Sequence, residues 1–144
     1  MTEIHVDPTR EAFDAFKALP RDQPIWMLNL VRYRDVAAYP EGHSLHGAGL
    51  SGAEAYRRYG EDSEPVFSRV GGSVIWRGAM KLMLTGPADE RWDTIFIAHY
   101  PTAGAFLAMV TDPDYREAVK HRQAAVLTSR LVRMQSLDVG SGFA

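Results

Sequence analysis

The sequence has no cysteine and no excess of positive charge. Without cysteine among its 144 residues, the chain can form no disulfide, thiolate nucleophile, iron–sulfur cluster or cysteine-ligated zinc site. A formal net charge of −2 gives no basic field that would attract nucleic acid or an anionic membrane. No apolar run approaches the roughly 20 residues that cross a bilayer, and the polar N-terminus is unlike a signal peptide. We therefore expect a cytoplasmic protein with no nucleic-acid or membrane partner.

The residues that are present suit a single domain over residues 1–144. The composition is 46% hydrophobic and 24% charged, and charges of both signs are scattered without a linker or a repeat. We expect a core over about residues 24–136, preceded by a helix over about residues 8–19. Asp7 is the expected N-cap of that helix, because Pro8 then takes the first helical position.

The order of the predicted elements indicates the fold. Strands are expected over residues 25–33, 73–85, 92–100 and 128–134, because these runs are rich in apolar and β-favouring side chains. Ser51 and Glu54 form a capping box that predicts a helix from residue 52, and Thr102 and Asp112 begin two further helices. This order is the split βαβ pattern of an α+β, ferredoxin-like fold, in which helices cover one face of four antiparallel strands.

Alternation along the strands predicts which side chains face the helices. In the first strand Trp26, Leu28 and Leu30 are uniformly apolar, so we expect them on the helix side, since buried polar groups need partners. The other set is mixed: Ile25, Met27, Asn29, Val31 and Tyr33. In the second strand Trp76 falls in the uniform set and Arg77 in the mixed one. The mixed face is still too apolar to be exposed to water. We therefore expect a second copy of the chain to cover this face, and the two sheets to enclose a barrel-like cavity in the dimer.

Five side chains are candidate ligand contacts in such a cavity, namely Asn29, Tyr33, Arg77, His99 and Arg130. Arginines bind a carboxylate or an enolate, whereas an amide and a phenol supply neutral hydrogen bonds. A hairpin turn near Ala88 would place Arg77 opposite Tyr100 and close to His99. Arg130 would lie toward Tyr33 at the other end of the sheet, so two polar clusters are expected.

These residues leave three functions open. The preferred hypothesis is a homodimer that binds a small organic ligand, either between the paired sheets or between helices and sheet. The second is a cofactor-independent oxygenase or isomerase, with His99 as general base and Arg77 or Arg130 stabilising an enolate. The third is a structural dimer whose arginines pair one to one with carboxylates.

Other motifs favour structural roles. Residues 47–52 match G-x-G-x-x-G, but a long loop precedes them and no carboxylate follows at the required distance, so helix capping explains them better than nucleotide binding. His43 and His46 lie near Glu41 on a glycine-rich loop that does not fix the geometry of a metal site. Arg122 is expected to pair with a carboxylate. We predict no metal and no organic cofactor.

With the elements placed, the chain resembles the domain-of-unknown-function family 1330 of the dimeric α/β-barrel superfamily. The resemblance implies a ferredoxin-like subunit that pairs through its sheet, and it implies no particular reaction. The family often has aspartate where this chain has Thr128, so any arginine partner of that aspartate needs another contact here. The matching stretches are 27–30, 51–56, 71–72, 76–78, 90–93, 100–101, 112–115, 121–122 and 129–131.

Overall fold

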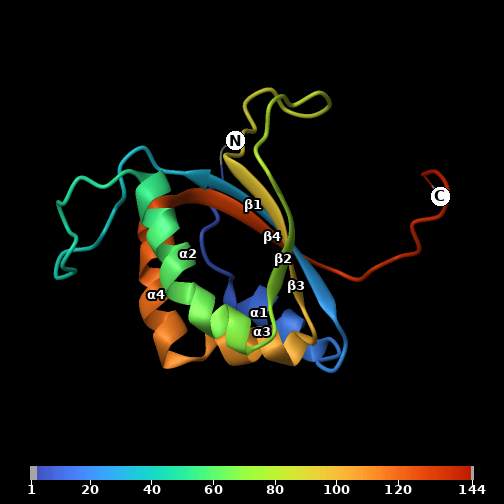
Figure 1. The fold of residues 1–144 in the computed structure, drawn as a ribbon. Helices are drawn as coiled ribbons and strands as arrows, with labels where there is room; N and C mark the ends of the chain where they lie inside the picture. Colours follow the sequence, from blue (N-terminus) through green and yellow to red (C-terminus); the bar gives the residue numbers. More distant parts are fainter. Residues whose placement is uncertain (1–2, 144) are drawn as a thin grey trace.

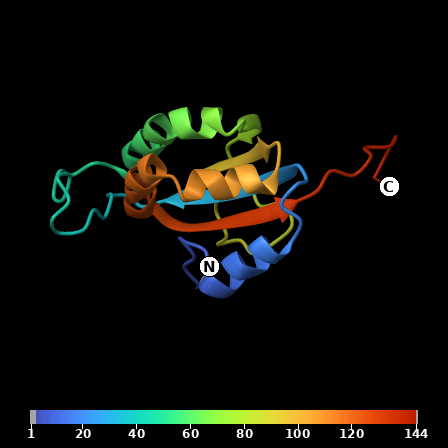
Figure 2. The same cartoon turned by 90° about the horizontal axis from the view of Figure 1, so that it is seen from below.

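A four-stranded antiparallel sheet with the strand order β2-β3-β1-β4 forms the centre of the structure. The computed structural model describes residues 3–143, and helices lie against one face of the sheet (Figure 1, Figure 2). This is the predicted ferredoxin-like fold. Its elements are α1 (Arg10–Ala18), β1 (Ile25–Tyr33), α2 (Gly52–Arg69), β2 (Ser73–Gly78), β3 (Thr94–Tyr100), α3 (Ala103–Val110), α4 (Pro113–Ala125) and β4 (Val126–Met134).

Local sequence signals fix most helix starts. The predicted capping box at α2 is confirmed, because Ser51 Oγ accepts the Glu54 N–H at 3.0 Å and donates to Glu54 Oε1 at 3.2 Å. Thr102 and Asp112 cap α3 and α4 as expected. The expected cap of α1 is wrong. Thr9 accepts the Ala12 N–H, so the helix begins at Arg10 and not at Pro8.

Strand β2 is shorter than predicted, since it ends at Gly78 and not near residue 85. The chain that would pair with residues 79–85 is engaged elsewhere. Asp93 donates its N–H to the Val31 carbonyl and accepts the Tyr33 N–H on its carboxylate, both at 2.8 Å. Asp93 therefore ties the start of β3 to β1, and residues 79–93 form a long connection.

The core lies between the helices and the sheet. Ile25 and Met27 of β1 are buried there with Ala98 and Tyr100 of β3, against Val66 of α2 and side chains from α3 and α4. The predicted assignment of the faces is thus reversed. The mixed set of β1 faces the helices, and the uniform set faces away from them, because strand side chains alternate.

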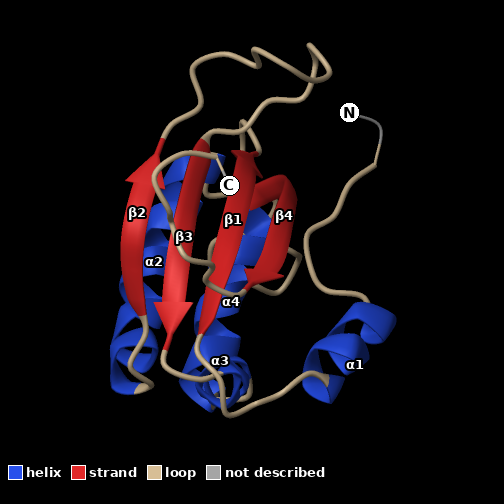
Figure 3. Ribbon diagram, turned by 90° about the vertical axis from the view of Figure 1, so that its right-hand side faces the viewer, coloured by secondary structure: helices blue, strands red, loops and turns tan. Residues whose placement is uncertain are grey.

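The two edges of the sheet differ. Along β4, the Ser129 N–H donates to the His5 carbonyl at 2.7 Å, and the His5 N–H donates to Thr128 Oγ1 at 3.1 Å. Arg122 holds the same segment, since Nη1 donates to the Val6 carbonyl at 2.6 Å. Residues 3–6 therefore cover this edge at Thr128 and Ser129 (Figure 3), whereas no backbone hydrogen bond within residues 3–143 reaches the outer side of β2.

Candidate functional site: the open face of the sheet

The face of the sheet that lies away from the helices, called here the open face, is turned toward the viewer in Figure 3. Its side chains follow from the strand registers, because directly paired residues of antiparallel strands point to the same side. Three rows run across it from β2 to β4: Ser73, His99, Trp26 and Met134; Trp76, Ile97, Leu28 and Val132; Gly78, Ile95, Leu30 and Arg130.

The middle row is apolar across all four strands and is accessible at both ends. Trp76 is 57% exposed and Val132 is 44% exposed. The indole of Trp76 lies over Gly78, where an added Cβ would come within 2.5 Å of the ring. A continuous apolar surface of this kind is typical of an interaction surface on a water-soluble protein.

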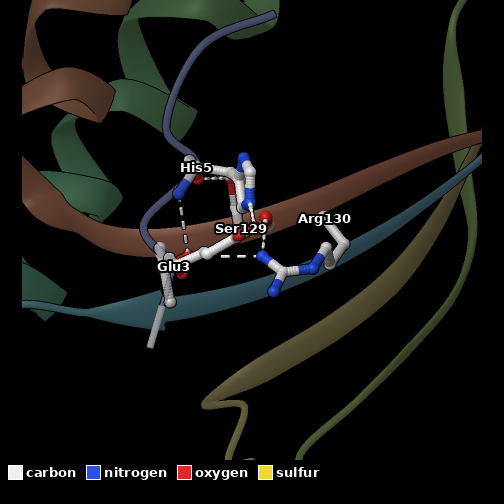
Figure 4. A network of polar contacts seen from close by, with 5 residues as sticks. Glu3, His5, Ser129 and Arg130 are labelled. Atoms are coloured by element: carbon white, nitrogen blue, oxygen red, sulfur yellow. Dashed lines mark hydrogen bonds and ion pairs between the residues drawn. The ribbon is translucent and has the colours of Figure 1, made fainter. Parts of the chain in front are cut away.

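Arg130 brings a positive charge to one end of the open face (Figure 4). Its Nη1 donates to the Ser129 carbonyl at 2.8 Å and to Thr128 Oγ1 at 3.3 Å. The guanidinium carbon lies 5.3 Å from the ring centroid of the buried Trp92. No carboxylate within residues 3–143 forms an ion pair with Arg130, whose other nitrogens have no protein partner there. The guanidinium is therefore held in place by Nη1, and its other N–H groups make no hydrogen bond within residues 3–143.

His99 lies at the opposite end of the open face. Its ring centroid is 4.9 Å from that of Trp26, and it makes no hydrogen bond within residues 3–143. The registers place His99 beside Trp26 and Arg130 beside Leu30, four residues along β1, which corresponds to about 13 Å. The two side chains therefore leave the sheet about 13 Å apart within one protomer.

The other three candidates lie on the helix face, contrary to the predicted arrangement. Asn29 donates to the Met27 carbonyl at 3.0 Å, and the Tyr33 hydroxyl is 2.7 Å from Thr94 Oγ1. Arg77 pairs with Phe96 and not with Tyr100, because β2 and β3 are registered so that Ser73 lies opposite His99. The expected cluster of Arg77 and His99 is therefore wrong, since the sheet separates them.

A second polar cluster joins the loop before α2 to the two long helices, and the sequence did not predict it. With the imidazole neutral, Tyr39 donates to His121 Nδ1 at 2.7 Å, and His121 Nε2 donates to Asp62 at 3.2 Å. His43 stacks on the Tyr39 ring with a centroid separation of 4.6 Å. Burial raises the pKa of Tyr39 and lowers the pKa of His121. The nearby Asp62 carboxylate acts in the opposite direction on His121, but the effect of burial is larger. These contacts fasten the loop onto α2 and α4.

We expect this cluster to make stability depend on pH. Because burial lowers the pKa of His121 in the folded state, the unfolded chain binds the proton more readily. The contribution of neutral His121 to the free energy of unfolding is complete above the unfolded pKa of about 6.5, and it is lost as the pH falls below that value. Thermal unfolding from pH 7.5 to 5.5 should show a smaller loss of Tm in His121→Gln than in the wild type. The exposed His5→Gln serves as control and should keep the wild-type pH dependence.

The glycine-rich and histidine motifs have structural explanations. Gly52 begins α2 against the backbone of Arg34, where an added Cβ would lie 2.1 Å from the carbonyl oxygen. His46 Nδ1 bonds to the Tyr39 carbonyl at 2.8 Å, so it does not converge with His43 on a common point. Arg122 lies 3.8 Å from an Asp7 carboxylate oxygen, which is the carboxylate contact that was expected. None of the helices over residues 3–143 combines the length and apolarity required to cross a bilayer.

Strand order and helix placement define the class as ferredoxin-like, and solved structures agree. The crystal structure of RPA0582 from Rhodopseudomonas palustris, a protein of unknown function, has a TM-score of 0.87 and 56% identity over 94% of this chain and 99% of that one. The methylated RPA0582 protein gives a TM-score of 0.89 and 56% identity over 98% and 100%. SnoaB, a cofactor-independent oxygenase from Streptomyces nogalater, shares the fold with a TM-score of 0.52 and 12% identity over 83% and 99%.

The sequence also matches a family. Residues 48–134 match the domain of unknown function DUF1330, and the chain belongs to this family. The resemblance found in the sequence is thereby confirmed. A comparison with curated proteins gives no significant match.

Proposed function

We propose that the protein is a homodimer, paired through the open face, that binds a small organic acid with an apolar body between the two sheets. The carrying observation is the open face itself, an apolar row that ends in exposed Trp76 and Val132 beside an arginine that no carboxylate of residues 3–143 pairs with. Helices cover the other face, so a second copy is the partner that removes this surface from water symmetrically.

Arg130 favours a ligand over a purely structural interface. Thr128, at the position where the family often has aspartate, offers Arg130 a neutral hydroxyl, so the charge is not neutralised locally. Guanidinium groups with free donors bind carboxylates by paired, charge-assisted hydrogen bonds. The apolar row beside Arg130 supplies the contact surface for the body of such a ligand.

The oxygenase or isomerase hypothesis has less support. SnoaB establishes a shared fold alone at 12% identity. In one protomer His99 is separated from Arg77 by the sheet and from Arg130 by about 13 Å along the strands. A base and an enolate-binding arginine must both reach one substrate, and His99 and Arg77, on opposite faces of the sheet, do not form such a pair.

The oligomeric state and one probe test the proposal. We expect light scattering and native mass spectrometry of the full chain to show a dimer at micromolar concentration. 1-Naphthoate should quench the fluorescence of Trp26 and Trp76, and Arg130→Gln should weaken its binding about tenfold, the loss expected for a charge-assisted bond. Arg57→Gln, on the exposed face of α2, is the matched control and should bind normally.

The neutral analogue 1-naphthylmethanol should bind equally to the wild type and Arg130→Gln. A monomeric full chain would overturn the dimer. Equal affinity of the wild type and Arg130→Gln for 1-naphthoate would remove Arg130 from the ligand site.

A further inference from the structure

The uncovered edge of the sheet carries apolar side chains. Val74 and Ile75 are 48% and 54% exposed, and they lie in the first half of the edge strand β2 with Trp76 beside them. The register shift between Val74 and Trp76 leaves Ile75 as an extra residue in the ladder with β3. Proteins usually cover, charge or shorten such edges, because an apolar edge with free backbone groups invites another chain.

The C-terminal segment, residues 135–143, also carries exposed apolar side chains. No hydrogen bond within the described part of the chain joins it to the fold, and Leu137 and Val139 are 78% and 90% exposed. These two residues alternate with Ser136 and Asp138, so an extended backbone places both on one side. The segment leaves the end of β4 on the side of the open face, away from the helices (Figure 1, Figure 3).

Symmetry brings these two features together. When two copies pair through the same sheet face, their twofold axis lies between the sheets. This axis can run along the strands or across them, and we take the axis along the strands, which places β4 of one copy across from β2 of the other. Met134 and Ser73 belong to the same row, so the segment leaving β4 emerges beside the start of the partner's β2. Sheets pack about 10 Å apart, a distance that three or four extended residues span.

We propose that in the homodimer each C-terminal segment crosses to the other copy and packs Leu137 and Val139 against the first half of its β2, at Val74 and Ile75. This inference rests on the proposed dimer and adds an exchange of segments to it. Each copy then covers the bare edge of the other, and the apolar side chains of both features leave water together.

Cross-linking between two single-cysteine variants tests the exchange, since the natural chain has no cysteine. Ile75→Cys and Val139→Cys chains are mixed, allowed to exchange subunits and treated with a short bis-maleimide. We expect the mixed dimer, identified by intact mass, in at least tenfold greater yield than from Glu11→Cys with Val139→Cys. Glu11 is an exposed residue in the first turn of α1 and serves as the control. Equal yields from the two mixtures would overturn the exchange.

Shortening the chain separates the exchange from the dimer. A chain that ends at Gln135 should dimerise at least tenfold more weakly than the full chain. The full-length variant Leu137→Ser/Val139→Ser should show the same loss and guards against misfolding of the shortened form. If the full chain is a dimer and both variants dimerise as tightly, the exchange is wrong and the proposed dimer stands. If the full chain is monomeric, the exchange and the proposed dimer are both wrong.

Discussion

Gly52→Ala should lower the free energy of unfolding by about 3 kcal/mol, at the upper end of what overpacking costs. The new Cβ would lie 2.1 Å from the Arg34 carbonyl oxygen and 2.9 Å from that of Ala125, and both are backbone atoms that cannot rotate away. The Gly52 N–H also donates to the Arg34 carbonyl at 3.1 Å, so the start of α2 is held at this separation. Chemical denaturation monitored by circular dichroism measures the change.

Gly60→Ala in the same helix is the matched control. An added Cβ at Gly60 meets nothing within 4 Å, so alanine should stabilise the helix by about 0.5–1 kcal/mol. Opposite signs for the two substitutions would confirm that Gly52 is required for close approach of the backbone. A stable Gly52→Ala protein would contradict this account of the third glycine in the G-x-G-x-x-G match.

Val132→Glu should weaken the dimer at least 100-fold, which corresponds to about 2.7 kcal/mol. Val132 lies on the open face in the row of Leu28 and Ile97, where pairing of two copies would bury a carboxylate from each. The effective penalty for burying an unpaired ion is several kcal/mol. Analytical ultracentrifugation across a concentration series measures the dissociation constant, and we expect a folded monomer.

Leu82→Glu controls for the change in charge and apolarity. Leu82 is 74% exposed in the connection between β2 and β3, so its replacement should leave the dimer intact. A Val132→Glu protein that dimerises like the wild type would show that the open face is not the interface. Loss of the dimer in both variants would point to an effect of net charge.

The sequence predicted the elements best where the signal is local. The bounds of β1, residues 25–33, agree with the structure because an apolar run lies between prolines and a loop. The caps at Ser51, Thr102 and Asp112 also agree, since a capping side chain contacts N–H groups only two or three residues away. The end of β2 was not predicted, because it depends on Asp93 bonding to a different strand.

The faces of the sheet were assigned wrongly for a physical reason. The prediction assumed that the uniformly apolar set must be the one inside the protomer. In the structure, however, Asn29 bonds to the Met27 carbonyl and Tyr33 to Thr94, so their polar groups are satisfied beneath the helices. A polar side chain with a nearby partner is compatible with burial, and alternation alone does not reveal such partners.

The candidate site was predictable only in part. His99 was correctly placed near the end of a strand, whereas Arg130 lies in the middle of β4 opposite Leu30 and not, as expected, beside Tyr33, which is on the other face of the sheet. The contact of Tyr39 with His121 joins residues 82 positions apart, and no periodic pattern links them. Contacts of this kind depend on how a loop folds back, which short-range signals do not encode.

The hydrogen bonds between residues 3–6 and β4 restrict how copies of this protein can associate with one another. A fibre in which sheets join edge to edge requires an unpaired edge strand on both sides of every sheet. Here Thr128 and Ser129 of β4 are already bonded to residues 3–6, so another chain cannot pair with this part of the edge. Joining of sheets edge to edge is therefore hindered at the start of β4, whereas a pair of molecules that meets through the open face does not use this edge.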